Sequence, residues 1–459
     1  MFFVMFILVL IGGALRYLRR IIHERYRHPQ TLAFFHPFCE GGGGGERVLF
    51  QAIDTLLNAE KRSRRRFDRI IIYSKATDST IEDVLNNVRK RFQIELIQNF
   101  DNSDRVKIEL VQLRSVWLLD PKNYPRFTLI LQSIAEIVVG FEAMYKFLPE
   151  VFIDTTGCPF TLPVFAWLGG CNVACYVHYP TITAQMFGRV SEGKAMYNNA
   201  DFIAKNKYLT FAKLWYYRIF AYLYRFCGFA AEVIMTNGSW TTEHIKMLWP
   251  GKPVMVYPPV DVHLYEKGAK IRNKSPAIIL SVGQIRPEKN HKLQIEVFQL
   301  LKQSNVNVTL TIAGGCRNDE DNQRLENLKN YAAELNVEKY IDWKINITNE
   351  ELRELNNTAL IGIHTMIEEH FGIAVVESIS AGCIMVAHNS GGPKYDIIKE
   401  GITGYLADTA EGYAKCIKNI IDSSDVELQK MRDEAIQDVE IFSVKNFSDN
   451  FLKALNELK

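Results

Sequence analysis

Residues 359–388 read ALIGIHTMIEEHFGIAVVESISAGCIMVAH. The apolar runs at 359–363 and 384–388 have the length of strands, and a helical segment separates them. A strand, a helix and a second strand in this order are typical of a parallel sheet covered by helices. Two carboxylates belong to this unit. Glu369 lies at the expected start of the helix, and Glu377 lies eight residues later in its apolar run.

The Glu369 and Glu377 pair allows two interpretations. Burying an ionised carboxylate in an apolar run costs several kcal/mol unless a partner satisfies it. A sugar or a ribose with vicinal hydroxyls is one such partner. Alternatively, Glu377 points outward from a solvated helix face. This stretch alone leaves both interpretations open.

Alternating strand and helix patterns extend over most of the chain. They predict an α/β fold of two Rossmann-like, doubly wound domains that face a central cleft, because ligands of such sheets bind beyond the carboxyl ends of the strands. Residues 257–276 interrupt the pattern with Pro, Gly and charge, which indicates a linker. The strand-like runs are 31–36, 69–74, 108–113, 151–155, 173–178 and 232–236 in the first series, and 277–282, 308–313, 359–363 and 384–388 in the second.

Bulk composition narrows the class of protein. A chain of 459 residues is too long for one ordinary core, which favours two domains. It is 47% apolar and carries a formal net charge of +2, and no basic run interleaved with aromatic residues indicates a nucleic-acid partner. The eight cysteines lie apart in apolar surroundings, which favours reduced thiols in a protein that faces the cytosol.

The N-terminus and one internal segment are candidates for membrane contact. Residues 1–15 (MFFVMFILVLIGGAL) are uncharged, and five arginines follow by position 27, so residues 1–28 are expected to be an N-terminal membrane anchor with a basic flank. The positive-inside tendency then places the rest of the chain in the cytosol. Residues 205–228 combine basic and aromatic residues at helical spacing, which suits either a membrane interface or a core helix. The basic cluster at 61–69 suits a solvated surface or an anionic membrane face.

Three groups of residues at strand ends are candidates for chemistry. A glycine run between a strand and a helix allows close approach to an anion, although a flexible turn is the alternative. Two cations after strand 277–282 suit a diphosphate leaving group, although a solvated turn would carry them equally. A histidine ends strand 173–178, where it is either a satisfied core residue or a functional one. These residues are Gly41, Gly42, Gly43, Gly44 and Gly45, then Arg286 and Lys289, and then His178.

We expect no metal ion and no cofactor. Asp319 and Asp321 match the Asp-x-Asp pattern of metal-dependent glycosyltransferases. They lie in the polar stretch CRNDEDNQR, which is most simply a solvated loop.

Longer segments carry a resemblance to a known family. They are HPFCEGGGGGERVLF at 36–50, GGCNVACYVHYPTIT at 169–183 and EEHFGIAVVESISAGCIMVAHNSGGPKYDI at 368–397. With the Glu369 and Glu377 pair and Lys289, they make the chain resemble the retaining glycosyltransferases of family 4, and within it the lipid-linked mannosyltransferases. The resemblance covers nearly the whole chain and implies a GT-B fold.

The resemblance also implies an activity and a location. The expected reaction adds two α-1,2-linked mannoses from GDP-mannose to Man3GlcNAc2-PP-dolichol during N-glycan precursor assembly. The expected place is the cytosolic face of the endoplasmic reticulum membrane, with other early lipid-linked mannosyltransferases as partners. The alternatives are a sister enzyme that makes α-1,3 and α-1,6 links, a nucleotide-dependent oxidoreductase, and a catalytically inactive membrane-tethered scaffold.

Roles for single residues follow from the resemblance, motif by motif. Glu377 would hold the donor ribose, Glu369 would contact the transferred mannose, and Lys289 with Arg286 would neutralise the diphosphate. Gln284 stands where many relatives have an arginine, and Arg286 would take over the role of that arginine. The other implied residues are Phe371, Gly372 and Ile373 for the donor, His178 for the mannosyl group, and Gly41 to Gly45 for the acceptor side near the phosphates.

The expected domains follow the pattern and the resemblance together. After the anchor at 1–28, an acceptor domain is expected at 29–262 and a nucleotide-sugar donor domain at 263–440. A C-terminal helix is expected at 441–459, where it could pack back on the acceptor domain.

Overall fold

The structure is a computed structural model that describes residues 26–59, 67–96, 106–182, 207–265 and 274–458, with Tyr17, Arg20, Ile21, Glu24 and Arg272. Residues 1–16 of the anchor and basic flank expected at 1–28 lie outside the described residues, as do the basic residues at 61–66 and residues 266–271 and 273 of the expected linker. The chain forms two compact units. The first comprises the described residues of Met1–Asn237, Thr241–Val256 and Ser448–Lys459, and the second comprises those of Gly238–Trp240 and Tyr257–Phe447.

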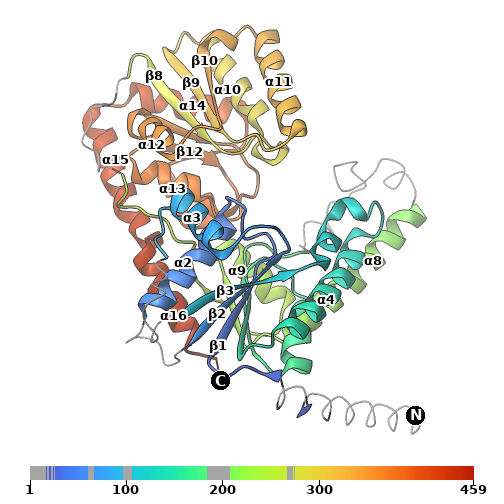
Figure 1. Ribbon diagram of the computed structural model, residues 1–459. Helices are drawn as coiled ribbons and strands as arrows, with labels where there is room; N and C mark the ends of the chain where they lie inside the picture. Colours follow the sequence, from blue (N-terminus) through green and yellow to red (C-terminus); the bar gives the residue numbers. More distant parts are fainter. Residues whose placement is uncertain are drawn as a thin grey trace. The chain divides into compact units, whose positions relative to one another are not determined.

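The first unit is built on a seven-stranded parallel sheet with the order β3-β2-β1-β4-β5-β6-β7. Helices cover both faces of this sheet (Figure 1). The strands are β1 (Thr31–Phe35), β2 (Arg69–Lys75), β3 (Lys107–Leu113), β4 (Val151–Asp154), β5 (Asn172–Val177), β6 (Val233–Thr236) and β7 (Val254–Met255). The helices are α2 (Gly44–Asn58), α3 (Ile81–Phe92), η1 (Ser115–Leu119), η2 (Pro121–Asn123), α4 (Thr128–Lys146), α5 (Thr161–Pro163), η3 (Val164–Gly169), α8 (Lys207–Gly228) and α9 (Ser239–Leu248).

The second unit is built on a six-stranded parallel sheet with the order β10-β9-β8-β11-β12-β13. Its strands are β8 (Ala277–Val282), β9 (Val308–Gly314), β10 (Ile341–Ile345), β11 (Ile361–His364), β12 (Ile384–His388) and β13 (Gly404–Ala407). Its helices are η4 (Pro287–Lys289), α10 (His291–Gln303), α11 (Asp319–Glu334), η5 (Glu338–Tyr340), α12 (Asn349–Thr358), α13 (Ile373–Ser380), η6 (Pro393–Ile397), α14 (Ala410–Asp422), α15 (Asp425–Asp438) and η7 (Val439–Phe442). Helix α16 (Val444–Leu455) begins in this unit and ends in the first.

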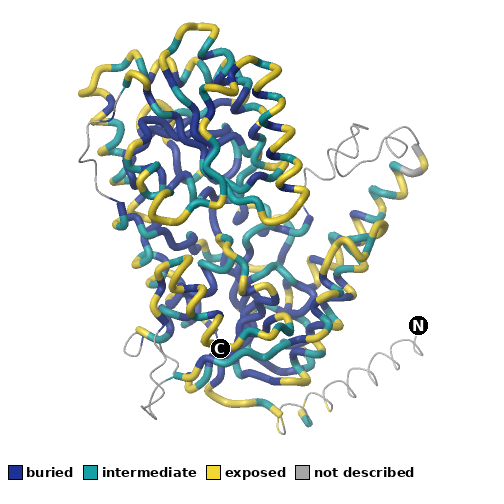
Figure 2. The backbone as a smooth tube through the Cα atoms, turned by 45° about the horizontal axis from the view of Figure 1, so that its top comes forward, coloured by how far each residue is buried: buried dark blue, intermediate teal, exposed yellow. Residues whose placement is uncertain are grey.

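Each unit has its own core at the centre of its sheet, where Figure 2 shows buried backbone flanked by exposed helix surfaces. All five residues of β1 are buried, because a central parallel strand is covered on both faces. In the first core, the Phe152 and Phe165 rings stack with centroids 3.7 Å apart. In the second core, Ile279, Leu310 and Val386 are almost fully buried.

All ten predicted strands are present, and the α/β fold with two doubly wound parallel sheets is confirmed. The pattern missed three strands. Two of them, β10 and β13, are edge strands with half-exposed residues, so their apolar signal is weak. The third, β7, has only two residues. Asp319 and Asp321 were expected in a loop, but they form the first turn of α11, where acidic residues favour the helix N-terminus.

The C-terminal helix contacts the first unit. The hydroxyl oxygens of Ser448 in α16 and Thr55 in α2 lie 2.8 Å apart, and the chain from Ser448 onward groups with the first unit.

Candidate functional site

The second unit gathers polar side chains around the point where its strand order reverses. From β8 the chain continues to β9 on one side of the sheet, whereas from β11 it continues to β12 on the other side. Ligands of open α/β sheets bind at the carboxyl ends of the strands at such a switch point. Lys289 follows β8 at the end of η4, and His364 is the last residue of β11. Glu369 lies in the loop between β11 and α13.

Lys289, His364 and Glu369 form one network. Lys289 Nζ lies 2.5 Å from Glu369 Oε2, and His364 Nε2 lies 3.1 Å from the same oxygen. The Glu369 side chain is only 14% exposed. Burial alone would raise the pKa of Glu369, but the hydrogen bond from His364 and the charge of Lys289 outweigh it and lower that pKa. The site therefore holds a buried carboxylate in its ionised form.

Glycines after β12 hold the loop that carries Glu369. Gly392 N donates a hydrogen bond of 2.7 Å to the Glu369 carbonyl, and Ser390 Oγ accepts one of 2.8 Å from Glu368 N. A Cβ on Gly391 would lie 2.2 Å from the Glu369 carbonyl oxygen, and one on Gly392 would lie 2.2 Å from that of Phe371. The backbone of the Glu369 loop therefore packs directly against Gly391 and Gly392, and a side chain at either position would clash with it.

A second set of contacts holds the backbone of Lys289. Thr365 Oγ1 lies 2.9 Å from the Lys289 carbonyl and accepts a hydrogen bond from Gln294 Nε2. His291, the first residue of α10, is buried beside Lys289, and neither of its ring nitrogens has a hydrogen-bond partner within the described structure. Burial and then the charge of Lys289 lower the pKa of His291 to about 4, so its ring is neutral at pH 7.

The other predicted donor residues lie at the start of α13. Gly372 is the N-cap with a φ of +106°, a conformation that favours glycine, and Ile373 begins the helix. Phe371 is buried and packs against the rings of Tyr257 and Phe442. Glu377 is half-buried in α13.

The structure does not bring Arg286 into the Lys289 network. Its side chain is 42% exposed, and its guanidinium lies 3.9 Å from Glu288. Asp321 of the Asp-x-Asp pattern is also engaged elsewhere, since it accepts from Arg317 N and pairs with Arg324. In the part of the chain that the structure describes, no three His, Cys, Asp or Glu residues are grouped to hold a metal ion.

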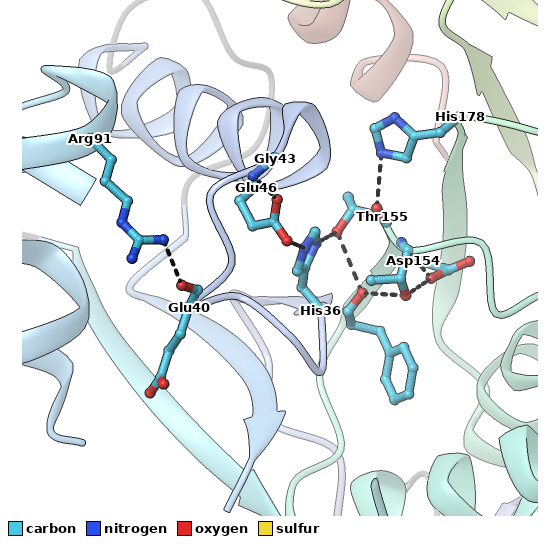
Figure 3. Close-up of polar contacts among 10 residues, drawn as sticks. His36, Glu40, Gly43, Glu46, Arg91, Asp154, Thr155 and His178 are labelled. Atoms are coloured by element: carbon cyan, nitrogen blue, oxygen red, sulfur yellow. Dashed lines mark hydrogen bonds and ion pairs between the residues drawn. The ribbon is translucent and has the colours of Figure 1, made fainter. Parts of the chain in front are cut away.

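In the first unit, polar groups meet at the carboxyl ends of the adjacent strands β1, β4 and β5 (Figure 3). His36 follows β1, and its Nδ1 lies 2.9 Å from Thr155 Oγ1. His178 follows β5, and its Nε2 lies 3.1 Å from the Thr155 carbonyl oxygen. Because a carbonyl only accepts, His178 Nε2 carries the proton of this hydrogen bond. Thr155 thus connects the two histidines.

The predicted glycine turn lies beside these histidines and wraps one carboxylate of its own chain. Gly43 N donates a 2.7 Å hydrogen bond to Glu46, and a Cβ on Gly41 would lie 2.3 Å from the same carboxylate. Burial would raise the pKa of Glu46, but His36 and backbone N–H groups lower it to about 2. A Cβ on Gly45 would lie 3.6 Å from His178 Nε2 and 3.8 Å from the His36 ring. The glycines therefore let the backbone of this turn lie close to other groups, and one of these groups is the Glu46 carboxylate.

Sequence reasoning missed several members of these two groups. His36 and His364 end or follow strands just as His178 does, so the rule that selected His178 would have found both. Thr155 and the Ser390–Gly392 turn follow strands too, but no residue type marks them, and only their contacts identify them.

Comparisons with known proteins agree with this architecture. Residues 29–249 match the family model described as ALG11 mannosyltransferase N-terminus, and residues 266–438 match the model described as Glycosyl transferases group 1.

Curated relatives match most of the chain. The GDP-Man:Man(3)GlcNAc(2)-PP-Dol alpha-1,2-mannosyltransferase of Homo sapiens is 40% identical over 446 residues, with 94% of this chain and 88% of the relative covered. The protein of the same name from Caenorhabditis elegans is 43% identical, with 86% and 84% covered. The one from Dictyostelium discoideum is 39% identical, with 93% and 85% covered.

Solved structures share the fold at low sequence identity. Anabaena HepE in complex with UDP and glucose has a TM-score of 0.62 at 13% identity and covers 93% of this chain and 100% of its own. Sucrose-phosphate synthase from Thermosynechococcus elongatus has a TM-score of 0.62 at 16% identity, with 91% and 96% covered. These structures are GT-B glycosyltransferases, which shows the GT-B fold for this chain.

Proposed function

Because this chain belongs to the family of GDP-Man:Man(3)GlcNAc(2)-PP-Dol alpha-1,2-mannosyltransferases, we propose that it transfers mannose from GDP-mannose to Man3GlcNAc2-PP-dolichol. Two successive additions give Man5GlcNAc2-PP-dolichol, the α-1,2-extended precursor of N-glycans. The observation that carries this proposal is the buried, ionised Glu369 beside Lys289 at the switch point of the second sheet.

The second unit is suited to the donor. Glu369 Oε2 is shared by Lys289 and His364, and Oε1 is left to accept hydrogen bonds from the hydroxyls of the transferred mannose. The Lys289 ammonium would neutralise charge that develops on the diphosphate as the glycosidic bond breaks. Glu377 would hold the ribose, Phe371, Gly372 and Ile373 would line the donor at the N-terminus of α13, and Arg286 would lend a second cation to the diphosphate.

The chemistry proposed here is a transfer with retention of the anomeric configuration. The acceptor hydroxyl attacks C1 of mannose from the face that GDP leaves, and the leaving phosphate takes the hydroxyl proton. Glu369 stays ionised throughout, since its pKa is held down by His364 and Lys289. We propose that no divalent metal takes part, and an unchanged rate in excess EDTA is the expected result.

The first unit is suited to the acceptor side. His178 Nε2–H is committed to the Thr155 carbonyl, so in the neutral ring Nδ1 is the nitrogen that can accept a hydrogen bond. We assign His178 to the mannosyl group and Gly41 to Gly45 to the acceptor side near the phosphates. Gly43 N already donates to Glu46, so this turn would act through its shape and its remaining N–H groups.

A lipid-linked acceptor requires membrane contact, and one surface of the first unit suits it. In α4, the exposed apolar residues Leu131, Ile134, Val138, Phe141 and Tyr145 follow one another at helical spacing. In α8, the same spacing is kept by Tyr208, Phe211, Trp215, Ile219, Tyr222 and Phe226.

The two stripes lie on neighbouring helices, and the α8 stripe has a positive charge beside it. Ile130 N in α4 donates to Tyr216 Oη in α8, and the two helices lie side by side (Figure 1). The Arg218 guanidinium lies 5.5 Å from the Trp215 ring centroid. Exposed apolar and aromatic residues with nearby arginines are typical of a helix that lies in a membrane interface. By length and composition, α4 is also the one described helix that could cross a membrane, but a third of its apolar window is buried in the protein.

We therefore propose that the enzyme lies on the endoplasmic reticulum membrane, with the apolar stripes of α4 and α8 in the lipid interface and both units on the cytosolic side. Other early lipid-linked mannosyltransferases are its proposed neighbours there.

The decisive experiment is incubation of the purified chain with GDP-mannose and Man3GlcNAc2-PP-dolichol, followed by mass and linkage analysis. The expected product is heavier by two hexoses, and an α-1,2-specific exomannosidase removes both. Added sugars that resist this enzyme would identify an α-1,3 or α-1,6 transferase instead. Absence of any transfer, with GDP-mannose still bound, would favour an inactive scaffold.

A further inference from the structure

His364 is a buried histidine whose imidazole reaches the centre of the donor site. Its side chain is 6% exposed, and its Nε2 lies 3.1 Å from Glu369 Oε2. An ionised carboxylate only accepts hydrogen bonds, so His364 Nε2 must carry a proton in this contact. The imidazole therefore donates to Glu369 whether or not the ring as a whole is charged.

This hydrogen bond decides which carboxylate oxygen remains open. Lys289 and His364 both use Oε2, and Oε1 has no partner among the described residues. Two donors on one oxygen fix the rotation of the carboxylate, whereas the flexible Lys289 side chain alone would let it turn. The result is an ionised oxygen that is held in place and free for a sugar hydroxyl.

The position of His364 is itself well supported. Its carbonyl accepts a 2.9 Å hydrogen bond from Tyr413 Oη, and Tyr413 is fully buried. The next residue, Thr365, contacts the Lys289 carbonyl. Residues 364 and 365 thus hold both members of the Lys289 and Glu369 pair, one through its carboxylate and the other through its backbone.

Other charged and titratable groups surround this network. Lys289, His364 and Arg324 all act on His291, and His364, Asp408 and Glu368 act on His388. Among the described groups, Lys289 and His364 lower the pKa of Glu369, and the half-buried His370 beside it interacts with the Glu369 charge. A change in the pKa of Glu369 after substitution of His364 is therefore attributable to the lost imidazole, through its hydrogen bond and its electrostatic effect.

We propose that His364 is a positioning residue, which fixes Glu369 as an ionised acceptor with Oε1 open to a hydroxyl of the donor sugar. The proposal rests on the assignment of the second unit to the nucleotide sugar. Because His364 acts through Glu369, we expect it to affect recognition of the sugar and the rate of transfer, and not recognition of the nucleoside diphosphate.

The test compares three full-length variants. His364→Leu removes the donor, whereas His364→Gln keeps an amide N–H that can reach Glu369 and does not titrate near neutral pH. Tyr413→Phe is the matched control, because it deletes a buried hydrogen bond to the same residue but leaves the imidazole. Each is measured for binding of GDP and of GDP-mannose by calorimetry, and for the pH profile of kcat/KM in mannose transfer.

Four results are expected together. His364→Leu loses about ten- to a hundredfold in kcat/KM, the factor of a lost hydrogen bond to a charged group, while its affinity for GDP is kept. In the same variant, the acidic limb of the pH profile of kcat/KM moves to higher pH, because Glu369 is more easily protonated without His364. His364→Gln recovers most of the activity and the original acidic limb, and Tyr413→Phe lowers the thermal midpoint with an unchanged pH profile.

Several outcomes would overturn the inference. Equal loss of GDP and GDP-mannose binding in His364→Leu, or a Tyr413→Phe variant with the same kinetic defect, would show a purely structural role. An unmoved acidic limb would show that His364 does not act through Glu369. If the wild-type protein bound a different nucleotide sugar, the proposed donor would be wrong, and the same variants compared on that sugar and its nucleoside diphosphate would still decide the role of His364.

Discussion

The Lys289 ammonium lies 2.5 Å from the Glu369 carboxylate, although 80 positions of chain separate the two residues. The contact is possible because β8 and β11 are adjacent in the sheet and their carboxyl ends open at the same edge. Both side chains are largely buried, so neither charge is well screened by water. Removing one partner leaves the other buried without compensation.

Lys289→Met is therefore expected to lower kcat on the order of a hundredfold or more, because the leaving diphosphate loses its cation. The pKa of Glu369 should rise at the same time, since Lys289 helps to lower it. Lys292→Met is the matched control. Lys292 lies three positions along in α10, with its ammonium 4.4 Å from the Tyr331 ring centroid, and its loss should leave the rate of transfer unchanged. Equal rates of transfer for the two variants would show that Lys289 does not act in the donor site.

Gly391→Ala should disrupt the loop that carries Glu369. At a φ of +60° the new Cβ would lie 2.2 Å from the Glu369 carbonyl oxygen, so the loop must move. A displacement of that size costs on the order of a hundredfold in rate. Gly401→Ala separates this effect from backbone strain, because Gly401 has a φ of +72° and nothing within 4 Å of its Cβ position. That control should lose about 1 kcal/mol of stability and keep its activity. Comparable activity of the two variants in steady-state assays would contradict the proposed role of the loop.

Stability should fall as the pH drops from about 6.5 towards 4, and His291 should account for part of the loss. Its pKa is lowered from 6.5 to about 4 in the folded chain, so the unfolded chain takes up a proton first. The stability contribution is complete above pH 6.5 and is lost as the pH falls to about 4, by about 3 kcal/mol in total. The slope of the free energy of unfolding against pH reports how many more protons the unfolded chain binds than the folded chain. In His291→Leu this slope, measured by urea unfolding at several pH values, should decrease by an amount that corresponds to nearly one proton. An unchanged slope would mean that His291 is protonated equally in both states.

Gly45→Ala should separate stability from activity. The second position of α2 tolerates alanine, and replacing glycine there should stabilise the helix by about 0.5–1 kcal/mol. The added methyl would lie beside the rings of His178 and His36 and would narrow the space proposed for the acceptor side. We expect a raised thermal midpoint with roughly tenfold lower kcat/KM, since one carbon in a fitted pocket is worth that much. Unchanged kinetics would place the acceptor elsewhere.

Acidic substitutions on the apolar face of α4 and α8 should weaken use of a membrane-embedded acceptor. Ile134→Glu and Trp215→Glu each place a carboxylate where an exposed apolar side chain now stands, and roughly tenfold lower kcat/KM on acceptor in anionic vesicles is expected for each. Val426→Glu in α15, which is 80% exposed, is the control. Activity on a short-chain, water-soluble acceptor should be equal in all three variants. Equal losses on both acceptors would show that the face is needed for folding rather than for lipid contact.

The central strands were the most predictable part of the fold, and the edge strands β10 and β13 were the least predictable. Central strands such as 277–282 and 384–388 coincide with β8 and β12 because both faces of a central parallel strand are buried, which leaves a continuous apolar run. β10 (IDWKI) alternates because it lies at an edge.

The candidate site divides in the same way. Lys289 and His178 could be selected because each is a reactive side chain beside a predicted strand end, and Glu369 because it lies at the start of the helix that carries Glu377. Arg286 met the same criterion as Lys289, and in the structure its half-exposed side chain lies beside Glu288 and outside the Lys289 network. Sequence position places a residue at the correct edge of a sheet, but it does not determine where the side chain points.

The sequence alone determined two parallel-sheet domains and the edges at which their functional residues lie, because strand burial and helix periodicity are local patterns. Only the tertiary structure decided how Glu369 and Lys289 are used. His364 fixes the carboxylate, Gly391 and Gly392 hold its loop, and Thr365 holds the backbone of Lys289. These partners come from different strand ends, and hydrogen bonding and close packing between distant segments leave no periodic trace in a sequence.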